Sequence, residues 1–249
     1  MHTNRRLEGK VAIVTGGTRG IGLAIAAALV EQGADVVATS RTDEHVKETR
    51  EYLGAVSGEA KREKQARFDV RVADVRDYAA VEQVVNHAVE QFGGLDILVN
   101  NAGIGSVGEV AAQPLEQWHD TIETNLTGVF HCCRAAIPHL RRRGGGWIVN
   151  ISSLASKHPF AGAAAYCASK AGLNAFSDAL MQELRYDDIR VSCILPGSVR
   201  TEFAGTHSGA GTEWKLAPED VAQAVVGLLL HDPRSLPSRV EIRPSKPRK

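Results

Sequence analysis

The chain has 249 residues, of which 43% are hydrophobic and 23% charged, a composition suited to one α/β domain with a substantial buried core. Lys plus Arg and Asp plus Glu both count 29, so the overall charge does not predict binding to nucleic acid or to an anionic membrane. The apolar runs are too short to span a bilayer, and no apolar segment follows the charged N-terminus, so we expect a cytoplasmic protein.

Short apolar segments alternate along the chain with longer segments of helical period. This alternation predicts an α/β fold with a doubly wound parallel sheet, right-handed crossovers and helices on both faces. The polar stretch 57–65 is expected to be a solvated insertion. The predicted strands cover residues 11–15, 35–40, 68–75, 95–100, 147–152, 191–195 and 239–242. The predicted helices cover residues 22–33, a charged stretch ending near Tyr52, 78–92, 115–142, 164–186 and 218–231.

The turn between the first predicted strand and the first predicted helix is rich in glycine, TGGTRGIG at residues 15–22. Gly16, Gly20 and Gly22 permit a sharp turn, let a pyrophosphate approach backbone N–H groups and allow a helix to pack closely. The spacing differs from GxGxxG, but the position between a strand and a helix predicts dinucleotide binding at the carboxyl edge of the sheet.

Four cysteines and several histidines could suggest disulfides or a metal site. Cys132, Cys133, Cys167 and Cys193 show no CxxC spacing, so we expect reduced and buried thiols. No HxxxH or HExxH pattern is present, so we predict no bound metal.

Tyr166 and Lys170 lie four residues apart in YCASKAG, so their side chains project from one face of a predicted helix. A neighbouring ammonium favours tyrosinate, which otherwise forms only near pH ~10, and so would let the phenol exchange protons at neutral pH. Such pairs are also common on helix surfaces without any chemistry, and the pair alone leaves both interpretations open.

Five motifs occur in a fixed order: TGxxxGxG at 15–22, NNAG at 100–103, Ser153, YxxxK at 166–170 and PGxxxT at 196–201. Together they resemble the short-chain dehydrogenase/reductase family over nearly the whole chain. The resemblance implies a single Rossmann-type domain over residues 1–249, with about seven strands. It also implies an enzyme that moves a hydride between a nicotinamide cofactor and a small carbonyl or alcohol substrate.

The resemblance implies that Tyr166 is the general acid/base, that Lys170 lowers its pKa and contacts the ribose, and that Ser153 donates a hydrogen bond to the substrate oxygen. This fits the chemistry, because a developing alkoxide needs a positioned donor and then a proton. Ser152 is the alternative to Ser153, and the family's spacing to the tyrosine favours Ser153. Asn125 matches the asparagine that holds a water between Lys170 and solvent; alternatively it is a satisfied polar residue that interrupts a helix.

The resemblance also implies a set of cofactor contacts. Asp74 and Val75 would lie near the adenine, and Val199 and Thr201 near the nicotinamide carboxamide. The expected cofactor-binding residues are Gly16, Thr18, Arg19, Gly20, Ile21, Gly22, Ser40, Arg41, Asp74, Val75, Asn101, Ala102, Gly103, Tyr166, Lys170, Pro196, Gly197, Val199 and Thr201.

The end of the second predicted strand, ATSRT, indicates the cofactor type. NAD enzymes usually place an acidic residue there, whereas this chain has Ser40 and Arg41. Arg19 is expected to face Arg41 across the 2′-phosphate, as in NADP-preferring members of the family, although both could be solvated arginines. Two guanidiniums bind a 2′-phosphate more strongly than they bind the ribose hydroxyls that NAD offers instead. We therefore predict NADP(H) as the cofactor.

The substrate is less well specified. Residues 202–217 are expected to form a lid that, with residues 154–165, shapes specificity. Members of the family that reduce 3-oxoacyl groups on acyl carrier protein often carry a basic residue where Asp187 and Asp188 stand, and adjacent carboxylates would repel an acidic carrier. That activity therefore remains one candidate among several.

Two other classes stay open as alternatives. A non-catalytic NADP-binding regulator would usually have lost the tyrosine or the lysine, and a sugar-nucleotide epimerase would need a longer chain. The resemblance also implies that helices 115–142 and 164–186 pair across a two-fold axis. We therefore expect a homodimer or homotetramer.

Overall fold

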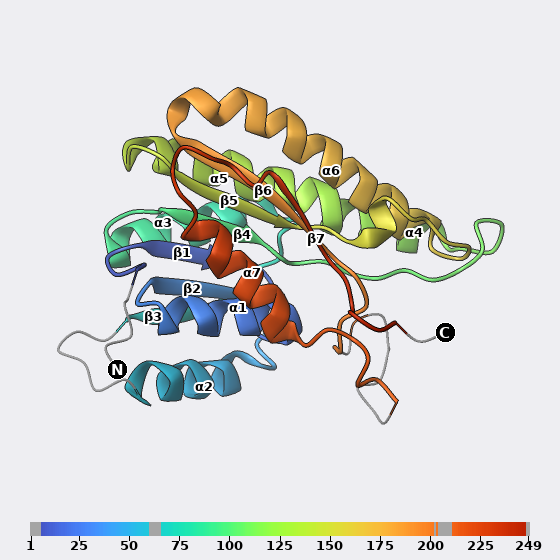
Figure 1. Cartoon of the computed structure of the whole chain (residues 1–249), viewed down its shortest axis with the longest axis horizontal. Helices are drawn as coiled ribbons and strands as arrows, with labels where there is room; N and C mark the ends of the chain where they lie inside the picture. The colour runs from blue at the N-terminus through green and yellow to red at the C-terminus, as the bar shows by residue number, and fades with distance from the viewer. Residues whose placement is uncertain (1–5, 60–65, 202, 204–210, 248–249) are drawn as a thin grey trace.

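The computed structural model describes residues 6–59, 66–201, 203 and 211–247. Seven parallel strands form one sheet in the order β3-β2-β1-β4-β5-β6-β7 (Figure 1). The strands are β1 (Val11–Val14), β2 (Asp35–Ser40), β3 (Phe68–Val72), β4 (Ile97–Asn100), β5 (Gly146–Ile151), β6 (Ile189–Pro196) and β7 (Arg239–Ile242). The order confirms the predicted doubly wound parallel sheet, whose direction of winding changes between β1 and β4.

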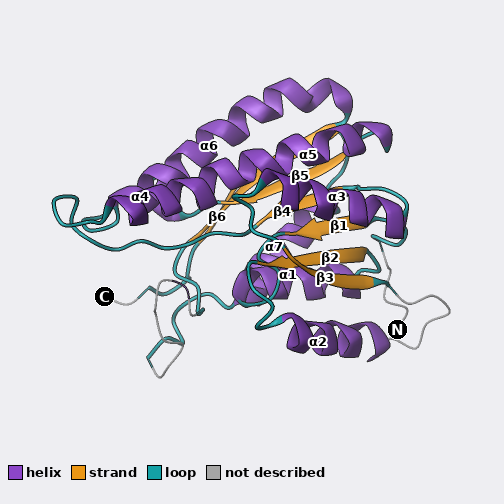
Figure 2. Ribbon diagram, turned by 180° about the vertical axis from the view of Figure 1, so that it is seen from behind, coloured by secondary structure: helices purple, strands orange, loops and turns teal. Residues whose placement is uncertain are grey.

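Helices cover both faces of the sheet (Figure 2). The main helices are α1 (Gly20–Glu31), α2 (Val46–Glu59), α3 (Tyr78–Phe92), α4 (Leu115–Ile122), α5 (Gly128–Arg142), α6 (Ala164–Leu184) and α7 (Pro218–Leu229). Shorter helical segments are η1 (Glu123–Thr127), η2 (Leu154–Ser156) and η3 (Arg185–Asp187).

Two large buried clusters make up most of the core, one on each face of the sheet, and a small third cluster contains Ala155, Ala163 and Cys167. In β1, Ala12 and Val14 join the cluster formed with α1, α2 and α7, whereas Val11 and Ile13 join the cluster formed with α3, α5 and α6. Strands covered on both sides need apolar residues at every position, because successive side chains point to opposite faces. This requirement explains the continuous apolar run that predicts β1 from the sequence.

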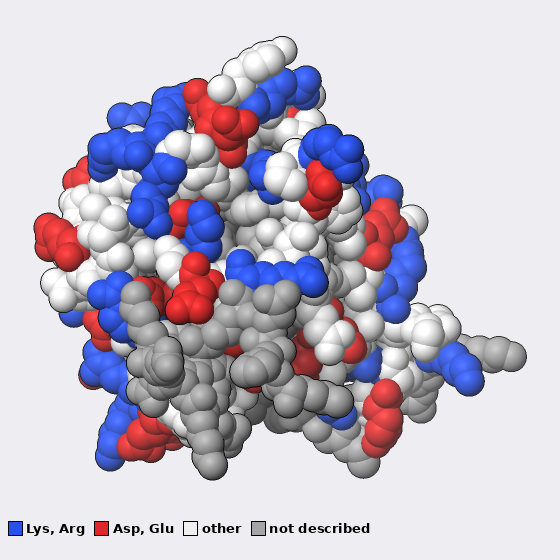
Figure 3. Space-filling view, turned by 60° about the vertical axis from the view of Figure 1, so that its left-hand side comes forward, with Lys and Arg blue, Asp and Glu red and all other residues white. Residues whose placement is uncertain are grey.

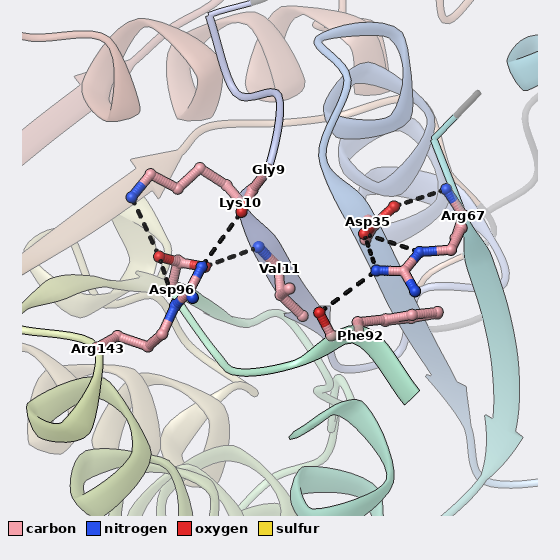
Figure 4. Close-up of polar contacts among 8 residues, drawn as sticks. All are labelled: Gly9, Lys10, Val11, Asp35, Arg67, Phe92, Asp96 and Arg143. Atoms are coloured by element: carbon pink, nitrogen blue, oxygen red, sulfur yellow. Dashed lines mark hydrogen bonds and ion pairs between the residues drawn. The ribbon is translucent and has the colours of Figure 1, made fainter. Parts of the chain in front are cut away.

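Ion pairs fasten the amino edge of the sheet, opposite the edge that carries the site residues. Asp96, immediately before β4, accepts hydrogen bonds from Val11 N (3.0 Å), Lys10 Nζ (3.1 Å) and Arg143 Nη2 (2.9 Å) (Figure 4). Burial raises the pKa of Asp96, but these bonds outweigh it and hold the pKa below its usual value. On the face shown in Figure 3, basic and acidic side chains are interspersed.

The structure corrects the prediction for the segment after Tyr52. Helix α2 does not end there but continues to Glu59, and the expected solvated insertion is wrong at its start. Thr49, Leu53 and Ser57 recur every four residues and are each less than 5% exposed, so one face of the helix stays buried. Ser57 Oγ donates to Ala66 O at 2.9 Å. The remainder of the expected insertion, residues 60–65, lies outside the described residues.

Two other differences from the predicted elements bear on the site. Strand β3 ends at Val72, so Asp74 and Val75 lie in the connection that follows it. The helix expected over 115–142 is divided into α4 and α5 by the π-helical turn η1.

All four cysteines are free and buried, as expected. Burial raises the pKa of Cys133 to about 12 and raises that of Cys132 as well. Within the described ranges, no helix is long and apolar enough to cross a membrane.

Candidate active site

The glycine-rich turn between β1 and α1 leaves little room for side chains at its glycines. Gly16 and Gly20 have φ values of 61° and 52°, in the left-handed region that favours glycine. A Cβ on Gly22 would lie 2.1 Å from Gly16 O, and one on Gly16 would lie 3.0 Å from Ala102 Cα. The turn therefore exposes backbone at the start of α1, where free N–H groups and the helix dipole favour an anion.

Thr15 and Asn101 fasten this turn to the end of β4. The Thr15 hydroxyl accepts hydrogen bonds from the backbone N–H groups of Asn101 and Ala102, both at 3.1 Å. Asn101 Nδ2 donates in return to the carbonyl oxygens of Thr15 and Gly16, both at 3.0 Å. Thr15 begins the motif at residues 15–22, but the motif alone does not predict these bonds. Asn101 makes structural bonds where a cofactor contact was expected.

The ends of β2 and β3 bring charged groups together. Ser40 ends β2 and is 8% exposed, while Arg41 and Arg19 are exposed. Hydrogen bonds from Arg76 do most to lower the pKa of Asp74, burial opposes them, and the charge of Arg41 contributes to the lowering. Arg41 therefore lies close enough to Asp74 to act on its carboxylate.

Arg76, for which no role was predicted from the sequence, joins this cluster to α4. Its guanidinium bonds Asp74 Oδ2 at 2.7 Å and Asp120 Oδ1 at 2.6 Å. Asp74 is thus paired within the protein, and Val75 is 7% exposed and packs in the core.

Tyr166 and Lys170 project from the first turns of α6, as their spacing predicts. Lys170 is 4% exposed; its Nζ donates to Ile151 O at 2.9 Å and lies 6.0 Å from the centre of the Tyr166 ring. Burial lowers the pKa of Lys170 to about 8, so the ammonium form predominates at neutral pH.

Ser153 stands at the end of β5 and caps the short helix η2. Its Oγ accepts a hydrogen bond from Ala155 N at 3.1 Å. Burial raises the pKa of Tyr166, and hydrogen bonding by Ser153 opposes that rise. The pKa of Tyr166 is thus raised overall, which is opposite to the lowering expected from Lys170. The effect of Lys170 on this pKa stays a prediction. Ser152 points toward α6 and bonds Asn174, which favours Ser153 in the substrate-facing role.

Asn125 lies in η1 and is fully buried. Its Oδ1 accepts from Ile104 N at 2.8 Å, and its Nδ2 donates to Ile104 O at 2.9 Å and to Ser169 Oγ at 3.0 Å. The side chain thus fastens the connection after β4 to α6, beside Lys170. It is satisfied by protein atoms and interrupts a helix, in line with the structural alternative, while its expected part in proton transfer stays a prediction.

Gly103 lies where Asn125 and Lys170 meet. A Cβ at this position would lie 3.2 Å from Asn125 Oδ1 and 3.5 Å from Lys170 Nζ. The fold therefore brings the ends of β4 and β5 together with η1 and α6. Asn125, Ser153, Tyr166 and Lys170 all border this region.

The segment after β6 reaches the glycine-rich turn. A Cβ on Gly20 would lie 3.2 Å from Thr201 Cγ2, and Val199 forms a bridge with Leu216. Pro196 is the last residue of β6, and Gly197 N donates to Ile242 O at 2.8 Å. The Phe203 ring lies 5.8 Å from that of Tyr166, centre to centre. Most of the expected lid, residues 202 and 204–210, lies outside the described residues.

The remaining expected contacts, Thr18 and Ile21, have structural roles. Thr18 is 7% exposed, and its carbonyl oxygen accepts from the Thr49 hydroxyl of α2 at 3.4 Å. Ile21 packs against the core. The described residues of this edge fit a dinucleotide: a glycine turn open to a pyrophosphate, basic side chains beyond β2, and a Tyr–Lys–Ser group beyond β5.

Comparison with known proteins agrees with this geometry. Residues 10–210 match the family described as short chain dehydrogenase. A 3α-hydroxysteroid dehydrogenase from Mediterraneibacter gnavus is 35% identical over 231 residues, covering 89% of this chain and 90% of that protein. A 3-oxoacyl-(acyl-carrier-protein) reductase from Salmonella typhimurium is 38% identical over 196 residues, covering 79% of this chain and 76% of that protein.

Solved structures share the fold. A metagenomic short-chain oxidoreductase in complex with NADP is 34% identical, with a TM-score of 0.82 over 96% of this chain and 99% of that chain. An alcohol dehydrogenase from the archaeon Thermococcus sibiricus, complexed with 5-hydroxy-NADP, is 29% identical, with a TM-score of 0.87 over 96% of this chain and 98% of that chain.

Proposed function

Because this chain belongs to the short-chain dehydrogenase/reductase family, oxidoreductases that act on alcohols and carbonyls, we propose that it uses NADP(H) to interconvert a small carbonyl compound and its alcohol. Arg41 and Arg19 support NADP(H), because Arg41 is exposed directly after β2, Arg19 is exposed at the start of α1, and no acidic residue ends β2. Two structural neighbours were solved with NADP or a derivative of it.

The glycine-rich turn would hold the pyrophosphate against the start of α1, and Arg41 and Arg19 the 2′-phosphate. When bound, the nicotinamide supplies or accepts the hydride. The Ser153 hydroxyl donates a hydrogen bond to the substrate oxygen, which becomes more negative as a carbonyl is reduced. Tyr166 then gives its phenolic proton to that oxygen, and in the reverse direction it takes the proton back. Lys170 provides the adjacent positive charge.

One observation carries this proposal: Ser153, Tyr166 and Lys170 meet at the carboxyl edge of β5, beside a turn that only glycines can form. Burial disfavours the charged forms of Lys170 and Tyr166 and so shifts the pKa values of both groups. Side chains with pKa values shifted in this way are concentrated at functional sites. The arrangement supports proton transfer to an oxygen at this edge.

The test is NADPH consumption with a panel of ketones, aldehydes and 3-oxoacyl thioesters. Tyr166→Phe removes only the transferable proton, so we expect turnover to fall by about 10²–10⁴-fold while NADPH affinity stays the same. Tyr186→Phe makes the same chemical change at a tyrosine that is 92% exposed, and should leave turnover unchanged. Near-normal turnover in Tyr166→Phe would refute the assignment.

Reduction of 3-oxoacyl thioesters is a second candidate, favoured by the likeness to the Salmonella reductase. The sequence argument against it was the pair Asp187 and Asp188. However, Asp187 forms an ion pair with Arg141 at 2.7 Å, which offsets one of the two charges that would repel an acidic carrier. Turnover of 3-oxoacyl thioesters alone would select this activity, whereas tight NADPH binding with no turnover across the panel would favour a regulator.

A further inference from the structure

A second buried polar residue follows Lys170 one turn later on α6. Asn174 is 7% exposed and faces the connection between β5 and η2. Its Oδ1 accepts from Ser152 Oγ at 2.7 Å and lies 3.4 Å from Cys193 Sγ, and its Nδ2 donates to Ser156 Oγ at 2.7 Å. Both serines flank Ser153 on the same short connection.

The Ser156 hydroxyl extends this contact to Ser153. It accepts from Asn174 and donates to Ser153 O at 2.5 Å, while Ser156 N donates to the same oxygen at 3.1 Å. On the other side, the Ser152 hydroxyl also lies 3.3 Å from Lys170 O. The residues Ser152 and Ser156 are therefore both bonded, through their hydroxyls, to the helix that carries Tyr166 and Lys170.

We infer that Asn174 is a positioning residue, which holds the connection 152–156 against α6 so that the Ser153 hydroxyl stays in register with Tyr166. The inference rests on the proposed roles of Ser153 and Tyr166. Among the described residues, no hydrogen bond joins Asn174 to Ser153 or Tyr166, so it acts on Ser153 through Ser152 and Ser156. Such precision matters because a displacement of about 1 Å in a reacting group can cost about 10²-fold in rate.

Helix α6 also carries a buried polar residue that can serve as a control for Asn174, because its hydrogen bonds run within the core. Ser177, three residues further on, accepts from Asn150 Nδ2 at 2.8 Å, and Asn150 Oδ1 accepts from Asn100 Nδ2 at 2.8 Å. This second network joins α6 to β5 and β4 and bonds none of residues 152–156 directly, although the Cys193 thiol contacts both Ser177 and Asn174. Ser177→Ala is therefore the matched control for a loss of buried hydrogen bonding on α6.

The experiment compares Asn174→Leu, which keeps a similar volume but removes the hydrogen bonds, with Ser177→Ala. We expect Asn174→Leu to lower kcat by about 10–100-fold, with cofactor Kd unchanged. Amide hydrogen exchange should accelerate at Ala155, Ser156 and Lys157 in this variant, because the turn that they form is no longer held. Ser177→Ala should show neither effect.

The pH profile of alcohol oxidation gives a further readout, which a merely structural role would not move. Tyr166 faces Ser153, and Cys167, Lys170 and Cys193 are the titratable groups around this end of α6. Because Ser153 opposes the rise in the pKa of Tyr166, loosening Ser153 should raise it further. The increase of oxidation rate with pH should then shift to higher pH in Asn174→Leu and stay in place in Ser177→Ala.

Ser156→Ala breaks the same connection at its other end and replaces only one small side chain. It should reproduce the loss of kcat, and the double variant with Asn174→Leu should be no worse than the stronger single variant. Suppose that Ser156→Ala and Asn174→Leu keep wild-type kcat and wild-type exchange, while Ser153→Ala loses activity. This result would overturn the inference about Asn174 but not the proposed function. Wild-type turnover in Ser153→Ala would instead overturn the proposed function.

Discussion

At the scale of single residues, the charge at the end of β2 sets the expected choice of cofactor. Arg41 is exposed, and its charge reaches the Asp74 carboxylate beyond β3. In Arg41→Asp a carboxylate would face the 2′-phosphate, so we expect kcat/KM for NADPH to fall by about 10²-fold or more, with a much smaller change for NADH. Kinetics with both cofactors in wild type and variant provide the measurement.

Lys47→Asp is the control for this reversal of charge, because Lys47 lies on the neighbouring helix α2 with its side chain 88% exposed. Lys47→Asp should change kcat/KM neither for NADPH nor for NADH. A wild type that prefers NADH, or equal losses for both cofactors in Arg41→Asp, would contradict the assignment.

At the scale of elements, the π-helical turn η1 joins the connection after β4 to helix α6. It turns Asn125 inward so that one amide pairs with both backbone groups of Ile104 and with Ser169 of α6. Asn125→Ala would leave both backbone groups of Ile104 without this partner and would remove one of the two bonds of the Ser169 hydroxyl, so we expect the free energy of unfolding to fall by about 1–3 kcal/mol. Urea unfolding measures it, with Asn86→Ala on the exposed face of α3 as the control that should change little. Unchanged stability in Asn125→Ala would show that the turn forms without its amide.

At the scale of the whole molecule, the amino edge of the sheet makes stability depend on pH. The folded-state pKa of Asp96 lies below its unfolded value of ~3.9, so its contribution is fully present above that pH and is lost as pH falls through the folded pKa. Asp96→Asn should cost about 1.5–3 kcal/mol at pH 7. The difference from wild type should shrink below about pH 4.

Urea unfolding at several pH values checks this expectation. Asp178→Asn serves as the control, because that carboxylate is 51% exposed and pairs with Arg239 at the surface. A difference between wild type and Asp96→Asn that does not change with pH would contradict it.

Exposed apolar side chains on α4 and α5 bear on the expected assembly. Leu115 is 78% exposed, Trp118 39% and Phe130 45%, while the exposed face of the adjacent α6 carries Ala171 and Ala175. If copies of the chain pair through these helices, Phe130→Glu should convert the homodimer or homotetramer into smaller species in light scattering at micromolar concentration. Tyr52→Glu, at a 50% exposed position on α2, should not. A monomeric wild type would refute the expectation.

The sequence was sufficient for what depends on period and local chemistry. Apolar runs buried on both faces predicted the strands, and the glycines predicted a turn whose φ values the structure then confirms at Gly16 and Gly20. The spacing of Tyr166 and Lys170 fixed their common face because helix geometry leaves no alternative.

Features that depend on distant partners could not be predicted in this way. The π-helical turn exists where Asn125 meets Ile104, and the roles of Thr15 and Arg76 depend on partners 86 and 44 residues away. The continuation of α2 past Tyr52 runs through Gly54, Ser57 and Gly58, which are weak helix formers, and the fold supplies the buried partner of Ser57, the carbonyl oxygen of Ala66. Asn174 gives no local pattern either, because Ser156 lies 18 residues before it.

The buried cysteines have a practical consequence. Thiolate, not thiol, attacks alkylating reagents, and the raised pKa values of Cys132 and Cys133 keep both groups protonated within the folded core. Cys167 and Cys193 are also covered by packing. Modification must then await opening of the core, so the rate of labelling by an excess of reagent would report how often the core opens. The chain thus carries four native probes for pulse-labelling by mass spectrometry, with no introduced tag.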